Sequence, residues 1–188
     1  MPEPQVKGLA FRSFVGAARR LHGAPVIDKM LPYLPVDVST AVSKDRFITS
    51  SWYPLSQYRA LHMALARATG GQPPELARAI GRDATMDDFR GIYRVLTFVL
   101  SPEFLVKRAP GLWNRYYDTG TLEVPTAKHG YAEARFRGCA GFDRVMWEDA
   151  IGGCMGMLEV CGAKEISTEV HRGGDDGCDY MDGIIRWR

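Results

Sequence analysis

The spacing of apolar residues changes near residue 119, and this change constrains the fold more than any other feature of the sequence. Upstream of it, Leu55, Tyr58, His62 and Leu65 follow the three- and four-residue spacing of an amphipathic helix. Downstream of it, apolar and charged residues alternate over residues 132–136, which is typical of a strand covered on one face. We therefore expect an α+β fold in which an N-terminal helical layer packs on an antiparallel sheet of four or five strands.

The C-terminal part, residues 119–188, follows the pattern strand, strand, helix, strand, strand. Leu122 and Val124 mark the first strand, and His129-Gly130 is the turn into the second. One long helix is expected over residues 143–161, followed by a hairpin whose strands are joined by a glycine- and aspartate-rich turn at residues 173–177. We expect a single domain over residues 1–188, in which residues 1–118 are mainly helical.

Within the helical part, the sequence predicts an extended segment over residues 6–15 and then several helices. Short helices are expected over residues 16–21, 26–34 and 38–44, and a longer one over residues 54–69. A short helix over residues 75–80 is expected to break at Gly81, with Thr85 capping a new helix whose apolar face runs over residues 89–99. Ser101-Pro102-Glu103 predicts the start of a last helix that ends near residue 117.

Composition excludes several classes of function. The formal net charge of +2 comes from 24 basic and 22 acidic residues, so no dense basic surface for nucleic acid is expected. The N-terminus lacks the regions of a secretion signal, and no apolar run approaches the roughly 20 residues that span a bilayer. The four cysteines do not form a disulfide pattern, which indicates reduced thiols and a cytoplasmic protein without a membrane span.

Four short motifs carry a resemblance to known families: Val6-Lys7-Gly8-Leu9, Leu100-Ser101-Pro102-Glu103, the small-residue helix at residues 151–163, and Ile184-Ile185-Arg186-Trp187. With this order of elements, the chain resembles the ligand-binding fold shared by TRAPP-type trafficking subunits, 4-vinyl-reductase-type sensor domains and bacterial haem-NO-binding-like domains. More closely, it resembles a myxobacterial paralogous family of unknown function. The resemblance implies a helix-on-sheet domain that is often dimeric and sometimes encloses an apolar pocket.

The resemblance also implies a metal site, because the sensor relatives often carry a zinc cluster of cysteines and a glutamate near the final hairpin. Cys178 stands at the start of the last strand, and Glu169 and His171 stand where a preceding cysteine would be expected. Thiolate, imidazole and carboxylate are suitable zinc ligands, but the chain has no CxxC pair. Buried structural thiols are the preferred interpretation of the four cysteines.

A second candidate site is an apolar pocket between the helical layer and the sheet. His62 lies on the apolar face of its helix, so it is a candidate haem ligand or a polar group of such a pocket. The large side chains expected around the pocket are Trp113, Tyr116, Tyr117, Phe136 and Trp147. The same residues could equally fill the core.

The glycines of the helix at residues 143–161 suggest close packing. Gly152, Gly153 and Gly156 would let this helix approach the sheet, another helix or a second copy of the chain. The run lacks the Lys-Ser/Thr of a phosphate-binding loop and falls inside a helical pattern.

These observations favour a non-enzymatic binding module that senses a small apolar ligand or serves as a protein-interaction or signalling adaptor. No GxSxG or HExxH motif indicates a hydrolase. We expect a homodimer, no cofactor and no nucleic-acid partner. The alternative is a sensor domain that depends on haem or zinc.

Overall fold

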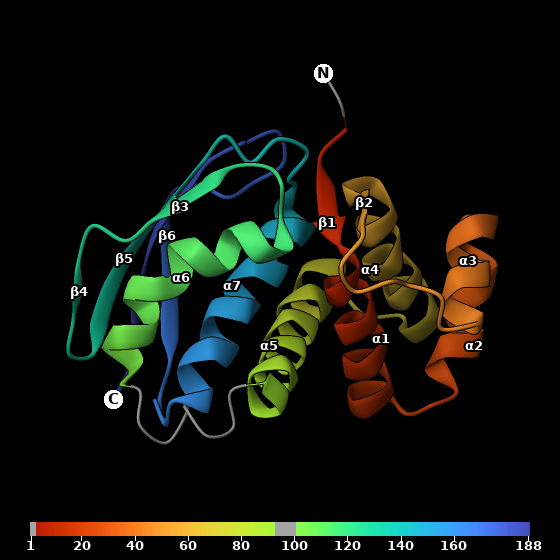
Figure 1. The fold of residues 1–188 in the computed structure, drawn as a ribbon, viewed down its shortest axis with the longest axis horizontal. Coiled ribbons are helices and arrows are strands. Elements are labelled where there is room, and N and C mark those ends of the chain that lie inside the picture. The colour runs from red at the N-terminus through yellow and green to blue at the C-terminus, as the bar shows by residue number, and fades with distance from the viewer. Residues whose placement is uncertain (1–2, 93–100) are drawn as a thin grey trace.

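The computed structural model describes residues 3–92 and 101–188 of the chain. Its first half is a layer of helices, with two short strands that pair antiparallel, β1 (Gln5–Lys7) and β2 (Trp52–Pro54). The helices of this half are α1 (Gly8–His22), α2 (Val26–Met30), the 3-10 turn η1 (Leu31–Tyr33), α3 (Val36–Ser43), α4 (Leu55–Thr69) and α5 (Pro73–Ile92). In Figure 1 these helices occupy one side of the molecule, and α5 lies between them and the second half.

The second half is a five-stranded antiparallel sheet with two helices, α6 (Pro102–Tyr116) and α7 (Arg144–Val160). The sheet is built from β3 (Thr121–Glu123), β4 (Ala127–Lys128), β5 (Tyr131–Arg137), β6 (Ser167–Gly173) and β7 (Met181–Arg186). Its order is β3-β5-β7-β6, with β4 beside β5. Figure 1 shows α7 between the sheet and α5. The expected α+β class with an antiparallel sheet is confirmed.

Two helix starts that the sequence predicts are present in the structure. The backbone N–H of Phe104 donates to Ser101 Oγ at 3.2 Å, which caps α6. The N–H of Met146 donates to Asp143 Oδ1 at 3.0 Å, which caps α7. Each bond satisfies a backbone donor that has no partner inside the helix.

The expected extended segment over residues 6–15 is wrong beyond residue 7. β1 ends at Lys7 and α1 begins at Gly8. The buried residues of α1 include Phe11, Phe14 and Ala18, which recur at helical spacing and face the core.

The expected helix break at Gly81 and the cap at Thr85 are also wrong, because α5 continues through both positions. Gly81 is tolerated within the helix because its missing side chain lets α5 lie directly against α7: a Cβ there would stand 2.1 Å from the backbone oxygen of Asp149. Of the helix predicted over residues 89–99, residues 89–92 belong to α5 and the remainder lies outside the described residues.

The N-terminal strand β1 is hydrogen-bonded to the segment between α6 and β3. The N–H of Gln5 donates to Asp118 Oδ1, and the N–H of Asp118 donates to the carbonyl oxygen of Gln5. Val6 and Tyr117 form an isolated bridge next to these bonds. Val6 is completely buried, so β1 is part of the core rather than a loose end.

Among the described helices, none is long and apolar enough to cross a membrane.

Candidate functional site

A cavity of about 110 Å³ lies between the helical layer and the second half of the molecule. Residues of α1, α4, α5, α6, β3 and α7 line it, so it lies where the two halves meet. Most of its lining is apolar, and the residues that provide this surface include Ala10, Ala84, Ala109, Leu112, Leu122 and Met157.

The most unusual lining residue is Asp149 of α7, a carboxylic acid that is 5% exposed. The hydroxyls of Tyr58 and Tyr117 donate to its Oδ2 at 3.4 and 3.3 Å. Its Oδ1 has no hydrogen-bond partner among the described residues. Burial raises the pKa of Asp149 to about 7, because the charged form loses its hydration. Burial and the neighbouring carboxylate raise the pKa values of both tyrosines well above 10.

His62 lies behind Asp149 and does not line the cavity. Its Nε2 is 3.5 Å from Asp149 Oδ1, and its ring makes edge contacts with Phe14 and Tyr58 at centroid distances of 4.8 and 5.1 Å. Burial lowers the pKa of His62 to about 3, so the imidazole is neutral near pH 7. The expected pocket histidine therefore does not face the cavity but contacts two of its lining residues, Asp149 and Tyr58.

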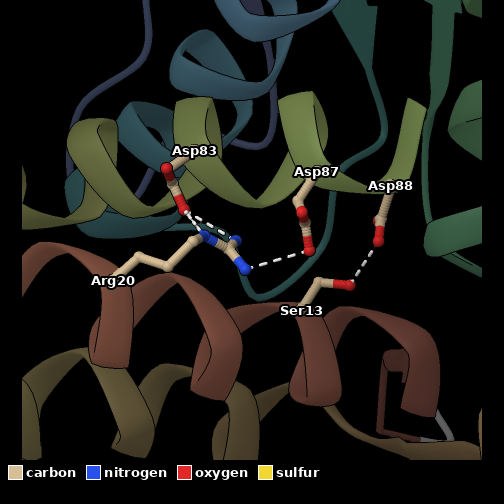
Figure 2. A network of polar contacts seen from close by, with 5 residues as sticks. All are labelled: Ser13, Arg20, Asp83, Asp87 and Asp88. Carbon is tan, nitrogen blue, oxygen red and sulfur yellow. Dashed lines mark hydrogen bonds and ion pairs between the residues drawn. The ribbon is translucent and has the colours of Figure 1, made fainter. Parts of the chain in front are cut away.

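A second carboxyl group, Asp88 of α5, lines the same cavity. Ser13 Oγ donates to its Oδ1 at 2.6 Å, and the hydroxyl of Tyr116 donates to its Oδ2 at 2.9 Å. Figure 2 shows that Arg20 of α1 pairs with Asp83 and Asp87, whereas the hydroxyl of Ser13 is hydrogen-bonded to Asp88. Desolvation raises the pKa of Asp88.

Direct backbone packing of α7 against α5 fixes the position of Asp149. A Cβ on Gly152 would lie 2.1 Å from the backbone oxygen of Arg78, and one on Gly156 would lie 2.3 Å from that of Arg82. Gly153 lies on the cavity side, where a Cβ would meet Thr85 Oγ1 at 3.2 Å. The small residues of α7 are thus in contact with a helix of the same chain.

The structure brings three of the expected aromatic residues to the cavity and leaves two in the core. Trp113, Tyr116 and Tyr117 line the cavity. Phe136 packs edge-on against Trp113 at 5.0 Å, and Trp147 packs against Phe136 at 5.8 Å. Phe136 and Trp147 support the cavity wall from behind.

The zinc candidates lie outside this cavity. His171 Nδ1 is 3.5 Å from Glu169 Oε1, and both side chains are exposed on β6. Cys178 lies in the loop before β7, where its carbonyl oxygen accepts a hydrogen bond from Trp147 Nε1. In the described part of the chain, no group of three or more His, Cys, Asp or Glu residues is arranged to hold a metal ion. The four cysteines are free thiols.

Sequence reasoning missed Asp149, Asp88 and Tyr58 as site residues. The available signal for Asp149 was its position on the helix at residues 143–161, on the face that carries Val145, Gly152 and Gly156. An acid on such a face must be buried or must face a cavity.

Comparison with known proteins identifies the fold. No family model and no curated protein matches the sequence. Solved structures of H-NOX domains match almost the whole chain. An oxygen-binding H-NOX domain related to soluble guanylate cyclases is 17% identical over 97% of this chain and 95% of its own, with a TM-score of 0.72. An unliganded Fe(II) H-NOX mutant from K. algicida is 17% identical over 97% and 96%, with a TM-score of 0.69.

A further structure, from work on haem redox potential and porphyrin distortion, is 18% identical over 97% of this chain and 99% of its own, with a TM-score of 0.70. At this identity the similarity shows the fold. The resemblance to haem-NO-binding-like domains is therefore confirmed, whereas nothing in the comparisons supports a relationship to the TRAPP-type or 4-vinyl-reductase-type domains or to the myxobacterial family.

These comparisons correct the expectation of no cofactor, because solved structures that share this fold are described as a haem protein and as an Fe(II) protein. They favour the alternative expectation, a haem sensor, over the apolar-ligand module. Whether haem suits this chain depends on the residues at the cavity.

The described residues do not fit haem in the present arrangement. A cavity of about 110 Å³ is well below the roughly 300–1,000 Å³ of pockets that hold drug-sized ligands. Of the four histidines only His62 is buried, and it lies behind Asp149. The sulfur donors at the cavity are Met157 and Cys154, and burial raises the pKa of Cys154 to about 11. The described lining offers Asp88 and Asp149, but no Lys or Arg, to the two propionates of haem.

Proposed function

We propose that this chain is a sensor domain with the H-NOX fold, which responds to a small ligand held in the cavity between its two halves. The observation that carries the proposal is the position of the cavity, where the helical layer meets α6, α7 and the sheet. A ligand there contacts both halves at once. Its binding can therefore change how α5 of the first half and α6 of the second half lie relative to each other.

The chemistry of the lining supports a binding role rather than a catalytic one. Both carboxyl groups at the cavity accept hydrogen bonds from tyrosine hydroxyls whose positions are fixed by packing. Such groups orient a ligand. The sequence also lacks the hydrolase motifs GxSxG and HExxH. Signalling through a homodimer or a protein partner remains part of the proposal, and light scattering of the purified protein checks the oligomeric state.

The second candidate function is haem-based gas sensing, which the comparisons favour. It requires the cavity to open well beyond its present volume and an iron ligand to come from residues such as Cys154 or Met157. Under this candidate, protein purified without added haem shows a Soret band, or gains one on titration with hemin.

One experiment separates the two candidates. The absorption spectrum of natively purified protein is recorded before and after addition of hemin, and thermal unfolding is then measured with small aromatic compounds of about benzene's size. Stabilisation by the small compounds without a stoichiometric Soret band supports the small-ligand sensor. A stoichiometric haem complex supports the second candidate, and the absence of both responses contradicts the sensor proposal.

A further inference from the structure

The two carboxyl groups at the cavity, Asp88 and Asp149, indicate which kind of ligand the cavity binds. They come from different helices, α5 and α7, and face the same apolar space. We propose that the cavity binds a compact organic cation, an amine or ammonium group on an apolar body of about benzene's size. This inference rests on the proposed function and specifies its ligand class.

The size of the cavity limits the size of the apolar part of the ligand. An engineered apolar protein cavity of about 150 Å³ binds benzene. The present cavity of about 110 Å³ is slightly smaller. Alanines at positions 10, 84 and 109 leave this space open, and each is less than a tenth exposed. The ligand therefore has one small ring or a short branched chain.

The charge of the cavity lining indicates which polar group the ligand carries. No Lys or Arg is present among the described lining residues, so neither carboxyl group has a cationic partner inside the cavity. Arg20, the nearby cation on α1, lies between α1 and α5, where it pairs with Asp83 and Asp87 rather than with Asp88 (Figure 2). A carboxylate buried without a counter-charge is costly, and a ligand cation would supply the missing charge.

The geometry at Asp149 leaves an acceptor for that cation. Tyr58 and Tyr117 occupy Oδ2, whereas Oδ1 has no hydrogen-bond partner in the described part of the chain. Nε2 of His62 lies 3.5 Å from Oδ1, and burial keeps this imidazole neutral near pH 7. Trp113 lines the same cavity, and an indole ring is a further group that attracts organic cations.

The test compares a cation with a neutral compound of the same shape. Binding of benzylamine and of benzyl alcohol to the full chain is measured by tryptophan fluorescence and by thermal shift. We expect benzylamine to bind at least about tenfold more tightly, as a charge-assisted hydrogen bond to a buried carboxylate implies. Asp149→Asn and Asp88→Asn should each remove most of this preference while the apolar contacts remain.

The matched control is Asp87→Asn, one residue from Asp88 on the same helix. The side chain of Asp87 is 59% exposed and faces Arg20, so this variant should keep the full preference for benzylamine. If Asp149→Asn does not fold, the comparison of Asp88→Asn with the control Asp87→Asn still tests the proposal.

The outcomes distinguish this inference from the proposed function. Equal binding of the two compounds, or a preference for benzylamine that survives both cavity variants, overturns the cation inference and leaves the small-ligand sensor in place. Failure of both compounds to bind at millimolar concentration overturns the small-ligand sensor proposal.

Discussion

Replacing Gly152 with alanine should measure how closely α5 and α7 are packed. The added Cβ would lie 2.1 Å from the backbone oxygen of Arg78, whereas ordinary contact begins at about 3.4 Å. The helices must therefore separate by about 1.3 Å at this point. Because the obstacle is backbone, no side-chain rotation can relieve the clash.

The expected cost follows from the packing of the whole interface. Gly81 and Gly156 also meet backbone at 2.1 and 2.3 Å, so a separation at Gly152 loosens contacts along both helices. Overpacking of this kind costs about 1–3 kcal/mol, and the better helix propensity of alanine returns at most about 1 kcal/mol. We expect Gly152→Ala to lower the free energy of unfolding by about 2 kcal/mol, or the Tm by about 4–8 °C.

Gly111→Ala is the matched control, because Gly111 also lies inside a helix but has no atoms within 4 Å of the position that an added Cβ would take. There the substitution should raise the free energy of unfolding by about 0.5–1 kcal/mol, through the conformational entropy of the unfolded chain. Urea denaturation followed by circular dichroism measures both variants. If Gly152→Ala is as stable as Gly111→Ala, the helices are not packed backbone to backbone and the reasoning is refuted.

Three other predictions concern the buried acid, a helix cap and the surface. Asp149 has a pKa near 7 in the folded state against an ordinary 3.8, so the stability it contributes is present below about pH 4 and is lost as the pH rises through 7. His62 acts in the opposite sense, because its pKa is lowered from 6.5 to about 3 and its contribution is lost as the pH falls below 6.5. In His62→Gln the trend of Asp149 should therefore appear without the opposing contribution of His62, as a fall in unfolding free energy of up to about 1.4 kcal/mol per pH unit between pH 4 and 7 in urea titrations; a rise with pH would contradict it. Ser101→Ala should cost about 1 kcal/mol through loss of the α6 cap, and an unchanged urea midpoint would argue against that cap. Arg20→Ala should cost less than about 1 kcal/mol, since its ion pairs with Asp83 and Asp87 are partly exposed, and a loss of several kcal/mol would show that this pairing is central to the fold.

The features that were predictable from the sequence are those with local causes. Ser101 and Asp143 cap helices because each side chain bonds to a backbone group three residues away. The alternation over β5 matches its register in the sheet, with Ala132 opposite Ile185 and Phe136 opposite Met181. Each of these depends on a short stretch of chain, which the sequence displays.

The features that were not predictable depend on distant partners. Thr85 resembles a cap, yet α5 continues through it because the helix is buried against α7. The role of Asp149 depends on Tyr58, 91 residues away, and on Tyr117, 32 residues away. The sequence shows an acid and two tyrosines, but only the fold brings them to one point.

The tie between β1 and the end of α6 makes the N-terminus a reporter of the cavity. Gln5 is hydrogen-bonded to Asp118, and Val6 bridges to Tyr117, whose hydroxyl reaches Asp149. The C-terminal residue Arg188 pairs instead with Lys164, at the far end of the sheet from these bonds (Figure 1). A spectroscopic label at residue 5 is therefore connected to the ligand site through hydrogen bonds, whereas a label at residue 188 lies outside this chain of contacts and can serve as the reference.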